Sequence, residues 1–509
     1  MGNNPSEKTA SNERGRLALK AGVWYLVSIF VIRGLTFLTT PIFTRLLTKD
    51  QYGVVRVYES WLDMLLPVFG LCIYQSMSRA KLDFEGEYYE YHSSVQALIM
   101  VFCGILAALL LIFRSTFESL LSMNTVMLVT MLCFMPMHSA VAAYQNREKQ
   151  LLHYRSNVLV MALSAIPATL ISIGAVWFFK TGTDADLVNV RIISFYAPQI
   201  TVGAVLAVSV FIQGRFTVKL SHWRYALRFS LPLIPHLLAM YVLAQCDRLM
   251  IKQLCGDDLA AVFSLAVSLQ YVLSLMIDAV EGSWVPWLFE KLAERDADAA
   301  ENRKAHNADI KKPFNTMMLA ACGLALLLAL AAPELIAVLG GEPYAEARYI
   351  VAPLLLSSLF AFLSRLYVSI EKYNKRTLLT AVSTVIVAAV NIPLNYIFIK
   401  KYGYIAAAYT TAFCYMLLML IHAAAVRLLI KEDCIRLSVP LGMVLCCGAC
   451  FALIMPLYGA AWGAALRYSL AALLLAAAYL IFRRQINDAV AGFIKNISSK
   501  SAKKTSEPR

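Results

Sequence analysis

Charged residues are scarce in this chain of 509 residues. They make up 15% of it, whereas an ordinary soluble domain carries about 25%. Hydrophobic residues account for 60%, and the mean hydropathy is +0.64. The longest polar connection lies around residues 288–315, which is too short for a soluble domain. These features exclude a soluble globular protein and indicate a chain built almost entirely of membrane-spanning segments.

Motifs of catalysis and metal binding are also missing. The sequence has no G-x-x-x-x-G-K-[ST] loop, so we expect no ATP hydrolysis. The C-x-x-C of Cys447 and Cys450 is followed by no second pair with zinc spacing, and we expect no metal site. Two D-x-D strings, 184–186 and 296–298, lie in loops too short for a nucleotide-sugar domain. We therefore predict no catalytic residues and no enzymatic activity.

Apolar runs long enough to cross a membrane recur along the whole chain. The 20 residues before the first run resemble no signal peptide, so we expect the first helix to be retained. We predict an all-α polytopic protein with fourteen spans: 21–44, 57–78, 94–113, 124–143, 156–179, 192–213, 229–250, 259–287, 316–339, 349–370, 378–399, 404–427, 439–457 and 468–483.

The basic residues are distributed unevenly between the two sides that these spans define. The tails and the loops after even-numbered spans hold 32 of the 46 Lys and Arg residues, counting those at span ends, and the loops after odd-numbered spans hold 11. By the positive-inside rule both termini are cytoplasmic. The formal charge of +14 follows from this topology, so we expect no nucleic-acid partner.

The two halves of the chain show a weak internal repeat. Residues 144–162 align with 371–389 so that Leu151 and Leu152 fall on Leu378 and Leu379. "RLLTKDQYG" after the first span and "RLMIKQLCG" after the seventh each place a Gly eight residues beyond the Arg. We predict two six-helix lobes in the same orientation, and parallel-repeat transporters place their substrate site between such lobes.

This interpretation divides the chain into six parts. They are a cytoplasmic tail (1–20), an N-lobe (21–213), a cytoplasmic linker (214–228), a C-lobe (229–428), two further spans (429–483) and a basic cytoplasmic tail (484–509).

Four stretches resemble one known family: "FTRLLTKDQYGVVRVYESW" (43–61), "CDRLMIKQLCGDDLAAVFSLAVSL" (246–269), "APELIAVLGGEPYAEARYIVAPLL" (332–355) and "NIPLNYIFIKKYGYIAAAYTT" (391–411). They are similar to bacterial polysaccharide flippases of the Wzx type, in the multidrug/oligosaccharidyl-lipid/polysaccharide (MOP) exporter superfamily. The second stretch departs from the family pattern at "DLAAVF", where the usual Gly before the next helix is replaced.

The resemblance implies a fold and a function. The fold is a V-shaped pair of six-helix bundles with two C-terminal helices, in the bacterial inner membrane. The function is alternating-access translocation of undecaprenyl-pyrophosphate-linked oligosaccharide from the cytoplasmic to the outer leaflet. Family members carry cationic residues in the central cavity to meet the pyrophosphate. A polysaccharide polymerase and a chain-length regulator are the protein partners that it implies.

Three arginines inside spans are the predicted pyrophosphate contacts. Arg33 lies about 18 Å into the first span at 1.5 Å per residue, near the bilayer centre, where charge is costly and usually functional. Its alternative is a structural ion pair, with Glu59 or Asp63 as partner. Arg248 and Arg365 lie nearer to span ends and could instead extend to the headgroups. If all three face a groove, they form a ladder at inner, middle and outer depth.

Four acidic residues are the predicted coupling-ion or sugar contacts. Glu59 and Asp63 share one face of the second span, and Asp278 and Glu281 share one face of the eighth. They could take up H⁺ or Na⁺, contact sugar hydroxyls, or neutralise arginines. We expect no other cofactor.

Two related functions and one unrelated function compete with the polysaccharide flippase. A lipid II flippase shares the chemistry and differs in the headgroup. A multidrug or organic-cation antiporter needs an anionic, aromatic cavity, which a central Arg33 argues against. A membrane-embedded polymerase or ligase needs a large outer loop with Arg or His, which the predicted topology lacks.

Overall fold

A computed structural model describes residues 5–182, 186–297, 303–432, 435–460, 462–481 and 483. The predicted basic tail, 484–509, lies outside these residues. The helices of the first half are α1 (Pro5–Leu46), α2 (Lys49–Phe69), α3 (Ser76–Asp83), α4 (Tyr88–Ile112), α5 (Arg114–Leu121), α6 (Thr125–Gln150), α7 (Tyr154–Gly182) and α8 (Leu187–Gln213). They are followed by α9 (Leu220–Ser230), α10 (Ile234–Cys255), α11 (Asp257–Ala297), α12 (Arg303–Leu330), α13 (Ala332–Gly340), α14 (Arg348–Tyr373), α15 (Thr377–Tyr402), α16 (Ala406–Ala424) and α17 (Ser438–Ile454).

The number of spans agrees with the sequence-based prediction. Thirteen helices of the described part are long and apolar enough to cross a membrane, the last being Gly463–Ile481, and one bent pair makes fourteen. That pair is α2 and the segment Ile73–Asp83, which meet at 61°. The second span was predicted as continuous over 57–78, but Leu71 and Cys72 have positive φ and end the helix. α1 also begins earlier than predicted, at Pro5.

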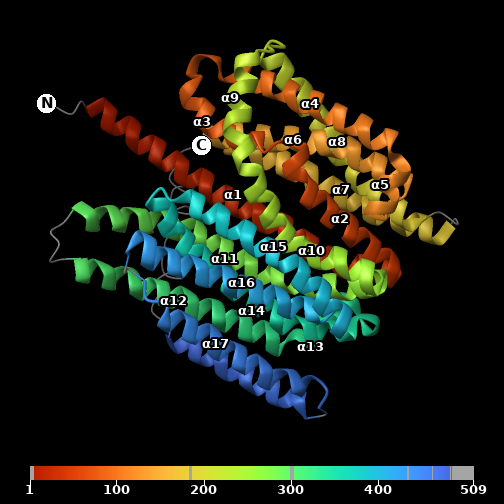
Figure 1. The fold of residues 1–509 in the computed structure, drawn as a ribbon, viewed down its shortest axis with the longest axis vertical. Helices are drawn as coiled ribbons and strands as arrows, with labels where there is room; N and C mark the ends of the chain where they lie inside the picture. Colours follow the sequence, from red (N-terminus) through yellow and green to blue (C-terminus); the bar gives the residue numbers. More distant parts are fainter. Residues whose placement is uncertain are drawn as a thin grey trace, which may run out of the picture.

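The helices form two groups that meet along α1, α2, α10 and α11 (Figure 1). In the first group α8 packs on both α6 and α7, and α1 packs on α7. In the second group α14 packs on α16 and α11, and α15 packs on α10 and α16, while α17 covers α12. We call these groups the N-lobe and the C-lobe. The all-α fold of two helical lobes and two additional C-terminal helices agrees with the prediction.

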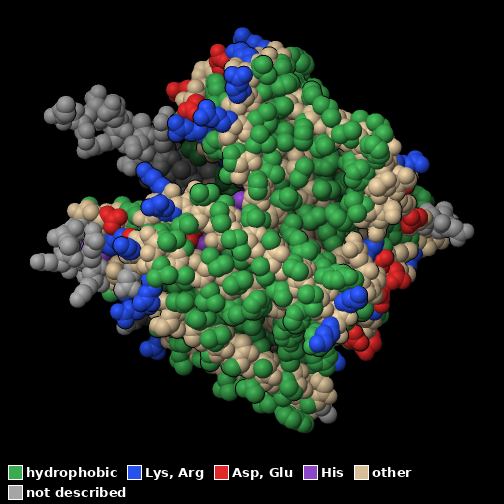
Figure 2. Space-filling model, in the orientation of Figure 1, with side chains coloured by type: hydrophobic (Ala, Val, Ile, Leu, Met, Phe, Trp, Pro, Cys, Tyr) green, Lys and Arg blue, Asp and Glu red, His purple; other side chains and the backbone are tan. Residues whose placement is uncertain are grey.

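Apolar side chains cover a broad band on the face shown in Figure 2, and charged side chains gather mainly toward its edges. Many large apolar residues are highly exposed in the protein alone, among them Leu170, Val205 and Leu378. A soluble protein rarely exposes such a continuous apolar surface, whereas a membrane solvates it. The described residues therefore form a multi-pass membrane protein.

The α6–α7 and α14–α15 turns have the same conformation, but the sequence alignment of these segments was wrong by four residues. Leu152 and Lys375, both with φ of 59°, occupy the same position in the α6–α7 and α14–α15 turns. The following amides of His153 and Arg376 donate to the carbonyls of Glu148 and Glu371, respectively. The true offset is thus 223 residues and not 227. An apolar helix shifted by four residues presents almost the same face, so sequence similarity alone did not exclude this register.

The two glycines used to support the repeat have different roles. Gly256 ends α10 with a φ of +102°, a conformation that favours glycine. Gly53 lies inside α2, and a Cβ there would come within 2.0 Å of the backbone oxygen of Asp257, the first residue of α11. Gly53 therefore allows the lobes to touch backbone to backbone at the end where α1 leads into α2.

Other contacts join the lobes at this same end, which we call the α1–α2 end. The Thr44 hydroxyl donates to the carbonyl of Leu339, and Arg45 donates to that of Val338 at 3.0 Å. The rings of Tyr52 and Tyr344 meet edge to face with centroids 6.1 Å apart. The structure thus has the two lobes in contact at the α1–α2 end.

We predict that Gly53→Ala separates the lobes at the α1–α2 end, because the added methyl group collides with a backbone carbonyl. Spin labels at the exposed positions Leu120 and Glu342 report the distance between the lobes, which should lengthen in the variant. Gly104→Ala is the matched control, since nothing lies within 4 Å of its added Cβ. Alanine favours helix by up to ~1 kcal/mol over glycine at both positions. An unchanged distance in Gly53→Ala would contradict the assignment.

Candidate functional site

A cluster of four charged residues connects the lobes within the membrane-spanning helices. Arg33 Nη1 of α1 lies 2.7 Å from Asp278 Oδ2 of α11. Arg365 Nη1 of α14 lies 2.9 Å from Asp278 Oδ1 and 2.9 Å from Glu281 Oε2. Asp278 thus holds one arginine from each lobe, and the cluster has no net charge. We call these four residues the central cluster.

The side chains of the central cluster are only partly covered by protein. Arg33 is 47% exposed, Asp278 36% and Arg365 35%. Charged groups in a membrane-spanning region pair with one another and face a water-filled cavity, because lipid does not solvate them. The cluster therefore marks a wet space between the lobes.

This arrangement changes the expected pairing and depth of the arginines. The partner of Arg33 is Asp278, and neither Glu59 nor Asp63 takes that role. Arg33 and Arg365 share one carboxylate, so they lie at one depth. The hypothesis of a three-step ladder is therefore wrong in its geometry.

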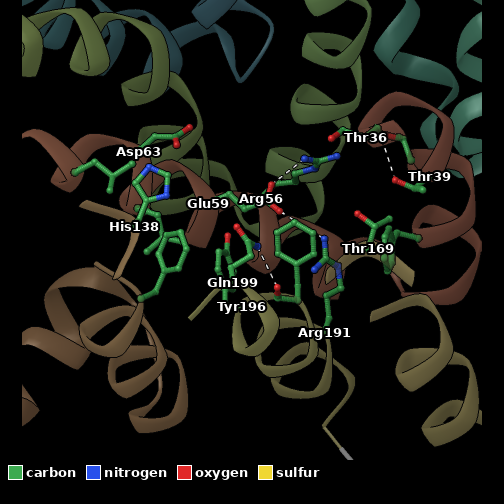
Figure 3. Close-up of a pocket in the computed structure, with 16 residues that line it drawn as sticks. Thr36, Thr39, Arg56, Glu59, Asp63, His138, Thr169, Arg191, Tyr196 and Gln199 are labelled. Carbon is green, nitrogen blue, oxygen red and sulfur yellow. Dashed lines mark hydrogen bonds and ion pairs between the residues drawn. The ribbon is translucent and has the colours of Figure 1, made fainter. Parts of the chain in front are cut away.

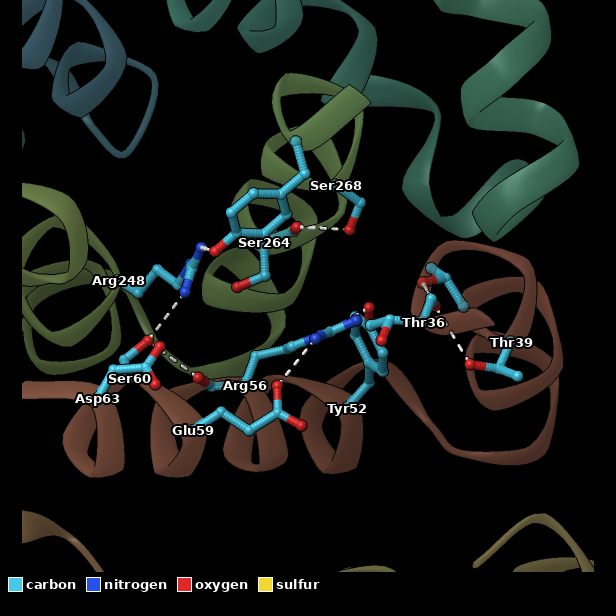
Figure 4. Close-up of polar contacts among 12 residues, drawn as sticks. Thr36, Thr39, Tyr52, Arg56, Glu59, Ser60, Asp63, Arg248, Ser264 and Ser268 are labelled. Carbon is cyan, nitrogen blue, oxygen red and sulfur yellow. Dashed lines mark hydrogen bonds and ion pairs between the residues drawn. The ribbon is translucent and has the colours of Figure 1, made fainter. Parts of the chain in front are cut away.

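Arg248, the third predicted arginine, belongs to a separate buried network (Figure 4). Its Nη1 donates to Ser60 Oγ of α2 at 3.1 Å and to Gln245 Oε1 at 2.6 Å, and its Nη2 donates to Tyr271 of α11 at 3.3 Å. Gln245 Nε2 in turn donates to Asp63 Oδ2 of α2 at 2.9 Å. Arg248 is only 6% exposed. Its contacts fasten α10 to α2 and α11. A structural role therefore accounts for this buried arginine.

A third set of charges lines a cavity in the N-lobe (Figure 3). Arg56 Nη1 lies 2.8 Å from Glu59 Oε2, and Arg56 Nε donates to the Tyr52 hydroxyl at 2.8 Å. Arg191 Nη2 lies 3.8 Å from Glu59 Oε1. Of the predicted acidic pair, Glu59 thus holds two arginines on the N-lobe side, and Asp63 lies in the same cavity wall.

Arg56 and Arg191 were missed because the predicted spans began at 57 and 192, directly after these two residues. The helices begin at Lys49 and Leu187, so both arginines lie within them. Hydropathy places a span boundary at the first charge, although a charge can continue a helix that faces a polar cavity. The signal that could have found them is helical spacing: Arg56, Glu59 and Asp63 recur every three or four residues.

The asparagines of the 391–411 stretch form a buried polar core in the C-lobe. Asn395 Nδ2 donates to Asp247 Oδ1 of α10 at 2.6 Å and to Asn391 Oδ1 at 3.1 Å. The Thr411 hydroxyl donates to Asp247 Oδ2 at 2.6 Å. These bonds join α10, α15 and α16. The sequence reasoning missed Asp247, although it directly precedes Arg248.

The C-x-x-C cysteines lie beside an apolar cavity of about 630 Å³. α11, α12, α17 and the last span enclose it, and Cys446, Cys447 and Cys450 contribute to its wall. In the described part of the chain, no group of three or more His, Cys, Asp or Glu residues could hold a metal ion. The cysteines here act as small apolar side chains.

Comparison with protein families decides the relationship. Residues 18–291, more than half of the chain, match the family of polysaccharide biosynthesis proteins. The chain belongs to this family. One relative is "Lsg locus putative protein 1" of Haemophilus influenzae, which is 22% identical over 296 residues and aligns over 54% of this chain and 67% of its own length.

Solved structures show the same fold. The lipid II flippase MurJ, in an inward closed conformation, matches with a TM-score of 0.64 at 14% identity, over 90% of this chain and 99% of its own. An inward-facing multidrug transporter of the MATE family in the MOP superfamily matches with a TM-score of 0.57 at 13% identity, over 81% and 99%. The chain is thus a member of the polysaccharide biosynthesis family whose fold is shared with a lipid II flippase and a MATE-family transporter.

We predict that Arg248→Gln destabilises the protein by about 1–3 kcal/mol, because the buried residues Ser60 and Gln245 lose a charged hydrogen-bond partner. The measurement is thermal unfolding of the purified protein in detergent. Arg114→Gln is the matched control: Arg114 is 56% exposed and pairs with Glu118 on its own turn, and such pairs contribute little. Equal melting of Arg248→Gln and wild type would contradict a structural role.

Proposed function

We propose that this protein is a flippase that moves an undecaprenyl-pyrophosphate-linked oligosaccharide from the cytoplasmic to the outer leaflet by alternating access. The observation that carries the proposal is the central cluster. It places two partly exposed guanidinium groups, one from each lobe, on a single carboxylate between the lobes. Membership in the polysaccharide biosynthesis family supports the choice of a glycan-bearing substrate.

The cluster has the chemistry to receive a pyrophosphate. A guanidinium has five N–H donors and binds phosphate oxygens in bidentate geometry. Phosphate oxygens from the substrate would compete with Asp278 for Arg33 and Arg365. The two arginines come from different lobes. A substrate bound by both would therefore replace Asp278 as the link between the lobes.

The same exchange offers a route for ion coupling. When a pyrophosphate occupies the arginines, Asp278 and Glu281 lose their counterions. A carboxylate without a cation partner inside a membrane is unfavourable, so uptake of H⁺ or Na⁺ would accompany substrate binding. In this proposal the two acidic residues serve the coupling ion and the two arginines serve the substrate.

The apolar cavity offers a place for the hydrocarbon part of the substrate. Its wall includes Met276 of α11, two residues from Asp278, so the cavity lies on nearly the opposite side of α11 from the central cluster. A lipid-linked sugar needs a polar place for the head and an apolar surface for the chain. α11 carries residues of both kinds.

We predict that Arg33→Ala and Arg365→Ala each lower glycan export at least about tenfold, which corresponds to ~1.4 kcal/mol of lost stabilisation. Each variant replaces the native copy in the host. Surface polysaccharide and the lipid-linked oligosaccharide remaining on the cytoplasmic face are then measured, with immunoblots of the membrane fraction to show equal amounts of protein. Arg155→Ala is the control, since Arg155 contacts the neighbouring Tyr154 at the start of α7.

The deletion strain distinguishes the related functions. An accumulated undecaprenyl-pyrophosphate-linked oligosaccharide supports the proposal. Accumulation of lipid II would indicate a peptidoglycan flippase, and transport of organic cations by the purified protein in vesicles would indicate an antiporter. Either of these results overturns the proposed substrate.

A further inference from the structure

A polar cavity within the N-lobe lies directly beside the central cluster. It has a volume of about 260 Å³ and is enclosed by α1, α2, α6, α7 and α8. We call it the N-lobe cavity. Thr36, Thr39 and Phe43 of α1 line it. Thr36 follows Arg33 by three residues, which is about 4.5 Å along the helix. The cavity therefore begins within one helical turn of the central cluster and extends from there toward the α1–α2 end.

Hydrogen-bond acceptors dominate one part of its wall. The hydroxyl of Thr169 donates to the carbonyl of Ala165 at 2.8 Å, and that of Thr39 donates to the carbonyl of Thr36 at 3.1 Å. Gln199 Nε2 donates to the carbonyl of Phe195 at 3.0 Å. Each threonine uses its only donor on its own helix, so its oxygen is left as an acceptor for a ligand. Gln199 uses one of its two N–H donors in this way, and its Oε1 is an acceptor too.

Two arginines supply donors, and aromatic rings lie beside them. The Arg191 guanidinium lies between the rings of Phe43 and Phe195, 4.3 and 4.2 Å from their centroids. Arg56 lines the same cavity and is held by Glu59. The positive charges of these two arginines are balanced by the carboxylates of Glu59 and Asp63. A cavity with no net formal charge suits an uncharged ligand more than an ionic one.

We propose that the N-lobe cavity binds a sugar unit of the substrate, close to its pyrophosphate. A sugar combines many hydroxyl donors with apolar ring faces, and the wall offers acceptors, guanidinium donors and aromatic rings for each of these features. The volume lies just below the ~300–1,000 Å³ of pockets for drug-sized ligands, so it accepts a small part of a glycan and not a whole oligosaccharide. The inference rests on the proposed function, since it takes the pyrophosphate to lie at the central cluster.

The test compares two ligands in the purified full-length protein. One is undecaprenyl pyrophosphate without sugar, and the other is the lipid-linked oligosaccharide extracted from host cells that lack this gene. The variant Thr169→Val/Gln199→Leu removes two acceptors from the cavity and keeps the side-chain shapes close. Thr201→Val/Gln213→Leu is its matched control, since both residues are exposed on α8 and bond within that helix.

Wild type and the control variant should bind the glycan-bearing lipid more tightly than the bare lipid. The cavity variant should lose affinity for the glycan-bearing lipid by about tenfold and keep its affinity for the bare lipid. A general folding defect would weaken both ligands and would not give this split. Arg33→Ala should weaken both ligands to a similar extent.

Two results would overturn the inference, and only one of them would also overturn the proposed function. If the cavity variant retains the full preference for the glycan-bearing lipid, the sugar subsite is wrong and the proposed function stands. If wild type binds neither lipid, the proposed function is wrong and the subsite is wrong with it. A fourth variant, Thr169→Val/Gln199→Asn, puts an amide back into the cavity variant and should recover part of the preference if a hydrogen bond to sugar is the cause.

Discussion

The carboxylate of Asp278 holds Arg33 of the N-lobe and Arg365 of the C-lobe at the same time, and the centre of the protein is organised around that contact. Three charged side chains from α1, α11 and α14 can stay within membrane-spanning helices because each has an opposite charge within 3 Å. Removal of one partner leaves the others uncompensated in a place that lipid does not solvate. The two lobes are thus connected by a partly exposed cluster of ion pairs whose members depend on one another.

The other polar groups of the interior join helices on the sides of this contact. Toward the α1–α2 end, Arg248 fastens α10 to α2 and α11, and Gly53 lets α2 and α11 touch. In the C-lobe, Asp247 ties together α10, α15 and α16 through Asn395 and Thr411. In the N-lobe, Glu59 orients Arg56 and Arg191 at the wall of a cavity. Largely buried polar connections thus surround one contact whose side chains are partly exposed.

Much of the fold could be predicted from hydropathy, and much of the site could not. The number of spans, the two lobes and the need of Arg33 for a partner follow from apolar runs and from the cost of a central charge. The partner of Arg33 does not follow, because Asp278 is 245 residues away and nothing in either segment specifies the pairing. Arg56 and Arg191 were assigned to loops, since hydropathy alone ends a span at a charge. The repeat was found with a shift of four residues, because apolar helices tolerate a displacement of about one turn.

The sequence by itself determined that this chain spans a membrane many times and that its few intramembrane charges need partners. It did so because hydrocarbon imposes the same condition on every segment, whatever its neighbours are. Only the tertiary structure decided which charges meet, that Arg33 and Arg365 lie at one depth, and that Thr169, Arg191 and Gln199 face one cavity. These features depend on how helices far apart in the chain pack together, and that packing is set by side-chain contacts that no single segment contains.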